Sequence, residues 1–131
     1  MQQRDFVERQ IEMMGRFLAG VLSKLAGRDL TSTQEANDVS QDMKAMLGFD
    51  VDELLALPEH RFVQTLLDTG NFDTANFEKL ADVLFLLAEP GQNLKLYARA
   101  LMLYQYLEVN DKAYSIERNL KISKIKALNI V

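Results

Sequence analysis

The strongest constraint on the fold is the choice of apolar residues. Leucine and alanine together number 33, whereas valine and isoleucine number 13. Leucine and alanine favour helices, while β-branched residues favour strands. No stretch alternates apolar and polar residues at a period of two, as a half-buried strand does. The sequence therefore predicts an all-α protein with almost no sheet.

The length and the turn residues predict how the helices are organised. The chain has 131 residues, which is in the range of about 100 to 200 residues typical of one domain. Its two prolines and six glycines mostly separate periodic segments, and they divide the chain into about six helices. We expect a single domain over residues 1–131, in which residues 1–70 and residues 71–131 share one core.

The first expected helix spans about residues 3–26 and carries a broad apolar stripe. The stripe is a heptad pattern of Val7, Ile11, Met14, Leu18, Val21 and Leu25, widened by Phe6, Met13, Phe17 and Leu22. A stripe this broad contacts more than one neighbour, so we expect the helix to cross the body of the domain. Gly15 and Gly20 favour close approach of another element.

Capping residues and turns predict the helices of the middle of the chain. Ser32 and Glu35 have the spacing of a capping box, and Gly48 ends that helix. Asp50 or Asp52 caps a short helix that runs through Leu57. Pro58 opens the next helix, which ends at Gly70. Asp73 or Thr74 opens a third helix, which ends at the turn of residues 89–91.

Two further helices complete the expected fold. The helix over about residues 93–109 is apolar nearly all round and is expected to be central. The last helix, about residues 112–128, places Ala113, Ile116, Leu120 and Ala127 on one side, extended by Ile122, Ile125 and Leu128. The apolar tail of Ile130 and Val131 is expected to dock on the body.

Composition and charge exclude several classes of protein. There is no cysteine, which excludes disulfides and thiolate metal sites and fits a reducing compartment, so we expect the cytoplasm. No signal peptide is visible, and the most apolar stretch, residues 94–109, is too short and too charged to span a membrane. Residues 29–90 carry three basic and thirteen acidic side chains, which disfavours binding to nucleic acid.

Candidate catalytic and metal-binding residues are better explained by structural roles. His60 is the only histidine and falls in a first helical turn, where a solvent-facing position explains it. The acidic residues Glu35, Asp38 and Asp42 share a helix face that we expect to be solvated, and Asp50, Asp52 and Glu53 are expected to be capping residues. Asp68 lies in an Asp-Thr-Gly segment whose glycine we expect to end a helix. With no phosphate-binding glycine loop, the sequence predicts no enzyme, no cofactor and no metal site.

The order of segments after residue 73 resembles a known architecture. A helix, a Pro-Gly turn, a helix, an Asn-Asp turn and a helix follow one another, with Phe77, Leu80, Ala81, Tyr97, Ala100, Tyr104 and Leu107 interleaved. This looks like one degenerate unit of tetratricopeptide-repeat packing, although the spacing is longer than the consensus and no second copy is present. The whole chain, from the opening segment of residues 5–19, also resembles a family of short uncharacterised bacterial helical proteins. That resemblance implies fold and bacterial origin but brings no activity.

These observations favour a non-enzymatic module that binds a protein or peptide partner. The expected surface is a concavity between the helix of Phe77 and the central helix, with Lys95, Tyr97, Arg99 and Tyr104 as contacts. For Tyr97, Tyr104 and Tyr106, packing in the core is the alternative interpretation. Two other functions stay open, namely a homodimer formed through the apolar stripe of the first helix and a small-molecule or lipid site inside the helical body.

Overall fold

The computed structural model describes residues 2–27 and 33–128, and every regular element within these ranges is helical. Seven α-helices and one 3-10 turn follow one another in these ranges: α1 (Gln2–Ala26), α2 (Thr33–Leu47), α3 (Val51–Ala56), η1 (Glu59–Arg61), α4 (Phe62–Asp68), α5 (Thr74–Ala88), α6 (Leu94–Asn110) and α7 (Ile116–Lys126). Six of the α-helices have seven residues or more. The all-α prediction is confirmed.

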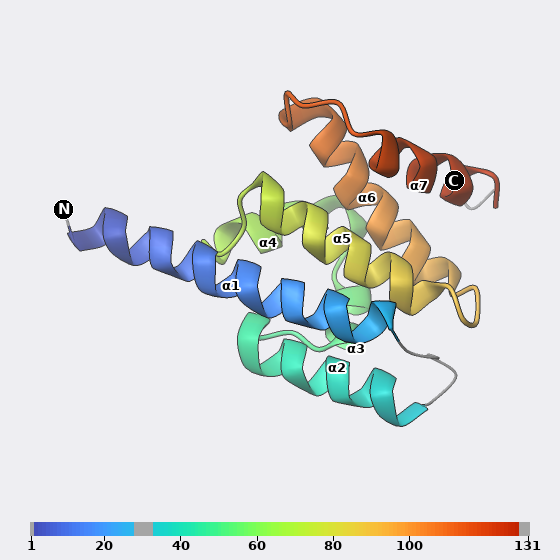
Figure 1. Cartoon of the computed structure of the whole chain (residues 1–131), viewed down its shortest axis with the longest axis horizontal. Coiled ribbons are helices and arrows are strands. Elements are labelled where there is room, and N and C mark those ends of the chain that lie inside the picture. Colours follow the sequence, from blue (N-terminus) through green and yellow to red (C-terminus); the bar gives the residue numbers. More distant parts are fainter. Residues whose placement is uncertain (1, 28–32, 129–131) are drawn as a thin grey trace.

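Helices α5 and α6 pack against each other at the centre of the molecule (Figure 1). Helix α1 packs on α5, and α7 packs on α6. Helices α3 and α4 also contact α6, while α2 lies against α1 and α3. The expected central position of α6 is therefore confirmed, but α5 shares it. One cluster of buried apolar side chains contains residues from all seven α-helices.

Local hydrogen bonds explain where several helices begin and end. Asp50 accepts from the amide of Glu53 and the Glu53 carboxylate accepts from the amide of Asp50, which is the reciprocal capping box at the start of α3. Asp73 caps α5 by accepting from the amide of Asn76. Gly48 and Gly70 end α2 and α4 at φ values of 86° and 78°, in the left-handed region that favours glycine. Two predictions lie outside what the structure describes. One is the capping box of Ser32 and Glu35, and the other is the docking of the tail, Ile130 and Val131.

The predicted start of the last helix is wrong, and only part of its predicted apolar side is buried. A loop over residues 111–115 precedes α7, and Ser115 caps the helix by accepting from the amide of Arg118. The buried side chains of α7 are Arg118, Ile122 and Ile125, whereas Ile116 and Leu120 are exposed. Ala113, which was expected on the helix, lies in the preceding loop, and Ile116, Leu120 and Ala127 are exposed.

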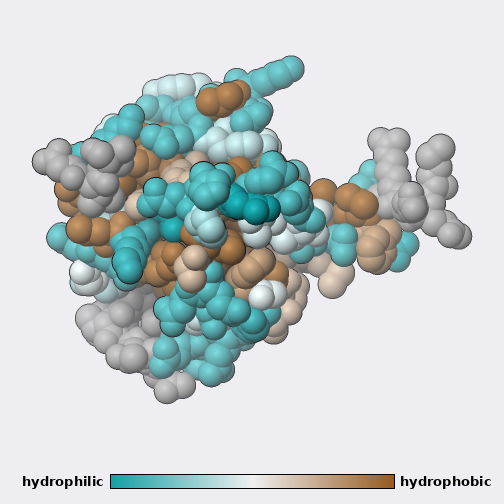
Figure 2. All heavy atoms as spheres, turned by 180° about the vertical axis from the view of Figure 1, so that it is seen from behind, coloured by the Kyte–Doolittle hydropathy of each residue, from teal (hydrophilic) through white to brown (hydrophobic). Residues whose placement is uncertain are grey.

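The stripe of α1 is only partly buried. From Met14 onward its residues pack into the core, as predicted. The N-terminal end of α1 instead extends beyond the other helices (Figure 1), and along this part of the helix Phe6 is 62% exposed and Met13 57%. Figure 2 shows the same end of the helix from behind, as an arm with apolar surface that projects from the body.

Helix α1 comes close to the start of α5 at Gly15. The buried side chain of Asn76 donates from Nδ2 to the carbonyl oxygens of Ile11, at 2.9 Å, and Asn71, at 2.8 Å. A Cβ atom added at Gly15 would lie 2.9 Å from Oδ1 of Asn76. Gly15 therefore makes room for the side chain that ties α1 to α5, as predicted. The close approach predicted at Gly20 is wrong, because a Cβ there would meet nothing within 4 Å.

Two alanine substitutions in α1 are expected to change stability in opposite directions. Alanine has a higher helix propensity than glycine by about 1 kcal/mol. Gly20→Ala is expected to realise most of this gain, because a Cβ there meets nothing within 4 Å. Gly15→Ala is expected to lower the free energy of unfolding by about 1 kcal/mol or more, because Asn76 is fixed by its hydrogen bonds and cannot move without losing them. Denaturant unfolding of both variants checks this, and equal shifts of the two midpoints would contradict it.

Candidate functional site

Two of the four predicted contact residues are part of the core. Tyr97 is buried, and its ring packs edge-on against Phe85 with centroids 5.5 Å apart. Tyr104 is 0% exposed, and its hydroxyl donates to Oδ1 of Asp82 at 2.6 Å. A partner bound to the surface cannot reach either ring in this structure. The interpretation of these tyrosines as core residues matches their positions.

The environment of Tyr104 also determines its protonation. Burial of the ring raises the pKa of its hydroxyl, and the negative charge of Asp82 raises it further. The phenol therefore stays protonated at any physiological pH and acts as a hydrogen-bond donor, not as a base. Asp82 also accepts from Nζ of Lys121 at 2.9 Å.

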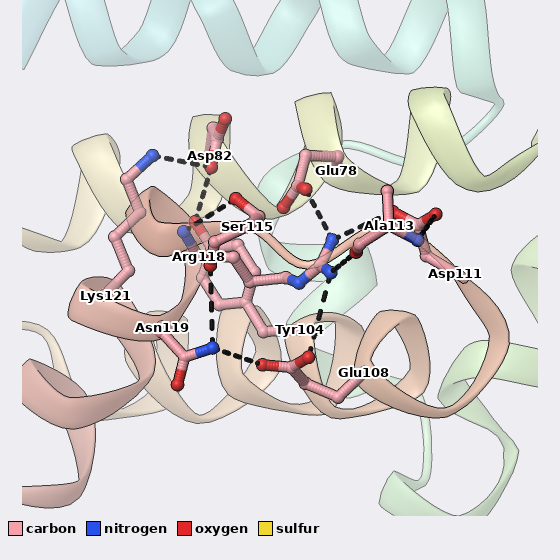
Figure 3. A network of polar contacts seen from close by, with 10 residues as sticks. All are labelled: Glu78, Asp82, Tyr104, Glu108, Asp111, Ala113, Ser115, Arg118, Asn119 and Lys121. Carbon is pink, nitrogen blue, oxygen red and sulfur yellow. Dashed lines mark hydrogen bonds and ion pairs between the residues drawn. The ribbon is translucent and has the colours of Figure 1, made fainter.

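A polar cluster surrounds Arg118, between α5, the end of α6 and α7 (Figure 3). Arg118 is 1% exposed. Its guanidinium donates to Glu78 at 2.7 Å, to Asp111 at 3.2 Å and to the carbonyl oxygen of Ala113 at 3.0 Å, and it lies 3.7 Å from Glu108. Arg118 is not among the site residues predicted from the sequence. Its only sequence signal is the spacing of four and seven residues to Ile122 and Ile125, which places an arginine on an apolar helix face.

The charges of this cluster are arranged to hold helices together. The pKa of Glu78 is raised by burial, and Arg118 opposes this rise. The pKa of Asp111 is lowered by its hydrogen bond from the amide of Ala113 and by Arg118. Both carboxylates therefore contact the same buried guanidinium, that of Arg118. This guanidinium holds α7 and the loop before it against α5 and α6.

The remaining candidates from the sequence occupy structural or exposed positions. His60 is exposed in η1, and Asp50 and Glu53 form the capping box. Asp42 lies 3.9 Å from Lys24, and the side chain of Glu35 is outside what the structure describes. Within residues 2–27 and 33–128, no three His, Asp or Glu side chains gather closely enough to hold a metal ion. No helix in the same ranges is long and apolar enough to cross a membrane.

A surface pocket of about 240 Å³ lies between α3, η1 and the first turns of α6. It is lined by Leu55, Glu59, Leu94, Lys95, Ala98 and Arg99. Two of the four predicted contact residues, Lys95 and Arg99, therefore meet at one site, although on the side of α6 that faces α3 and not in a concavity with α5. Lys95 is exposed, and Leu94 beside it is an exposed apolar residue.

Arg99 forms a fixed wall of this pocket. Its Nη2 donates to the carbonyl oxygens of Leu55 at 3.2 Å and Leu57 at 2.8 Å, and its guanidinium carbon lies 5.2 Å from the centre of the Phe62 ring. Nη1 lies 3.7 Å from the carboxylate of Glu59, which is exposed. The buried Nε of Arg99 has no hydrogen-bond partner in the described part of the chain. Arg99 thus satisfies the carbonyls that end α3 and keeps a positive charge at the pocket.

Comparison with known proteins adds a family but no activity. Neither a curated protein nor a solved structure matches this chain. A family model described as a family of unknown function (DUF6483) matches residues 1–127. This match covers nearly the whole chain, so the protein belongs to the DUF6483 family, as the resemblance to an uncharacterised helical family implied.

Proposed function

We propose that the protein is a non-enzymatic module that binds a peptide segment of a partner protein in the pocket between α3, η1 and α6. One observation carries this proposal: the pocket brings the exposed apolar side chain of Leu94 next to the cationic side chains of Lys95 and Arg99. Pockets that bind peptides combine apolar surface with a few polar groups that fix the orientation of the ligand.

The lining of the pocket indicates the chemistry of the peptide. Leu55 and Ala98 supply apolar surface for one apolar side chain of the ligand. Lys95 and Arg99 supply positive charge for a carboxylate, and the first turn of α6, where Lys95 lies, adds the partial positive charge of a helix N-terminus. Glu59 now lies close to Arg99, and because its side chain is exposed it can turn aside for a bound carboxylate. The expected ligand is a segment with an apolar residue beside an acidic one.

The C-terminal half supports the same proposal. Helices α5, α6 and α7 follow one another through short turns, as in helix-turn-helix repeats of the tetratricopeptide type that bind peptides. The absence of cysteine fits a partner in the cytoplasm.

Selection from a library of short peptides displayed on phage tests the proposal. The full chain is immobilised, and the selected peptides are measured against Leu94→Ser, Lys95→Glu and the control Leu120→Ser. Leu120 on α7 is 66% exposed and Leu94 is 51% exposed, so the two serine substitutions are matched. We expect acidic, apolar peptides whose affinity falls about tenfold or more in both pocket variants and is unchanged in the control. Peptides that bind all variants equally, or no enrichment at all, would refute the proposal.

A further inference from the structure

The projecting end of α1 presents an apolar surface that the rest of the chain does not cover. Phe6, Val7 and Met13 are exposed there, and Phe17 further along is only half-buried. Phe6, Met13 and Phe17 are spaced by seven and four residues, so they lie in one line along the helix. The contact between α1 and α5 ends near Gly15 and Asn76, and the line of apolar residues continues beyond this point toward the N-terminus. These side chains form an apolar stripe that is exposed to solvent on the projecting end of α1 (Figure 2).

Four exposed charges form an edge beside this stripe. Asp5, Arg9, Glu12 and Arg16 alternate in sign and lie on one side of α1. Glu12 and Arg16 also border a groove of about 400 Å³ between α1 and the start of α5, where their side chains are 65% and 80% exposed. The edge is therefore accessible to another molecule along its whole length.

The order of these charges is complementary to itself. When the segment is laid antiparallel on a copy of itself about a point between residues 10 and 11, Asp5 meets Arg16 and Arg9 meets Glu12. The same register sets Phe6 of one copy opposite Gly15 and Val7 opposite Met14 of the other, one or two residues from the level of Met13. A two-fold interface requires that each contact be made twice with the partners exchanged, and this pattern fulfils that requirement. In a parallel two-fold pair the charged edges of the two helices would instead lie on opposite sides of the seam, so these ion pairs could not form.

We propose that the projecting end of α1 pairs antiparallel with the same segment of a second copy of the chain, about a two-fold axis near residues 10 and 11. Phe6, Val7 and Met13 form the apolar seam of this dimer, and the edge of Asp5, Arg9, Glu12 and Arg16 forms four ion pairs across it. The peptide pocket lies elsewhere, between α3 and α6, so this proposal does not depend on the proposed function.

Charge reversal tests the register. Arg9→Glu and Glu12→Arg each replace two attractive contacts of the dimer by repulsive ones. The dimerisation affinity of each variant alone is therefore expected to fall about tenfold or more. In an equimolar mixture, however, the acidic side chain introduced at position 9 of the first variant would face the basic side chain introduced at position 12 of the second. The heterodimer is therefore expected to regain the affinity of the wild type. Sedimentation equilibrium over a range of concentrations measures the affinities, and native mass spectrometry distinguishes the heterodimer by its mass.

The alternation of charges also suits ion pairs within one helix, as the 3.6 Å approach of Arg16 and Glu12 shows. Mixing separates the two explanations, because a loss of helix within each copy cannot be rescued by the other copy. Reversals on the outer side of α7, Glu117→Arg and Lys126→Glu, serve as the control and should leave dimerisation unchanged. A wild-type chain that is monomeric at all concentrations, a dimer indifferent to the α1 reversals, or a mixture that fails to recover would each overturn the proposal.

Discussion

Replacing Arg118 by alanine is expected to lower the free energy of unfolding by about 3 to 5 kcal/mol, the usual cost of removing one partner from a buried ion pair. The substitution leaves the carboxylate of Glu78 partly buried without the cation that lies 2.7 Å from it. It also removes the donor to the carbonyl oxygen of Ala113 and the partner of Asp111. We expect α7 to lose much of its attachment to α5 and α6 before the rest of the chain unfolds.

Denaturant unfolding followed by circular dichroism measures this loss, and hydrogen exchange locates it. Lys124→Ala is the matched control, since it removes another cation of α7, whose 3.0 Å ion pair with Glu89 is exposed. Exposed pairs contribute about 0 to 1 kcal/mol, so the control should change little. Equal losses in the two variants would show that the Arg118 cluster does not hold α7.

The positions of most helices before α7 could be predicted because their signals are local. Asp50, Asp73 and Gly70 cap or end helices through hydrogen bonds and backbone angles within four residues, and the sequence shows all the groups involved. The heptad stripe of α1 was likewise visible, and it is buried in the core from Met14 onward.

The buried face of α7 could not be predicted, because it depends on residues far away in the chain. Helix α7 has apolar residues on opposite sides, with Ile116 and Leu120 on one and Ile122 and Ile125 on the other. By periodicity the first side is as good a core face as the second. The choice is made by Arg118, which pairs with Glu78 some 40 residues earlier. A pattern confined to one helix contains no information on such a pair.

The candidate site shows the same limit. Tyr97 and Arg99 have the residue types of a binding surface, but their exposure depends on which elements pack against α6. Phe85 covers Tyr97, and the carbonyls of Leu55 and Leu57 engage Arg99. Only the exposed position of Lys95, in the first turn of α6, follows from the sequence itself. The pocket needs α3 beside α6, and nothing local indicates that contact.

Truncation of Phe77 to alanine is expected to have the other large effect, a loss of about 3 to 5 kcal/mol in the free energy of unfolding. Phe77 is almost wholly buried in α5, and its ring centre lies 5.0 Å from that of Phe72 and 5.1 Å from that of Tyr106. The substitution leaves a cavity between α5 and α6 at the centre of the core, which neighbouring rings cannot fill without leaving their own contacts. Thermal unfolding should show a melting temperature lower by about 10 °C or more.

The same substitution at Phe6 separates the two roles of aromatic residues in this chain. Phe6 is 62% exposed, so Phe6→Ala should leave the unfolding of the monomer nearly unchanged at high dilution. At concentrations at which the chain pairs through α1, the variant should instead dimerise more weakly than the wild type. Because Phe77→Ala acts on the core and Phe6→Ala on the projecting seam, stability and self-association should respond to different variants. A large loss of monomer stability in Phe6→Ala would mean that the end of α1 packs on its own body and is not free to pair.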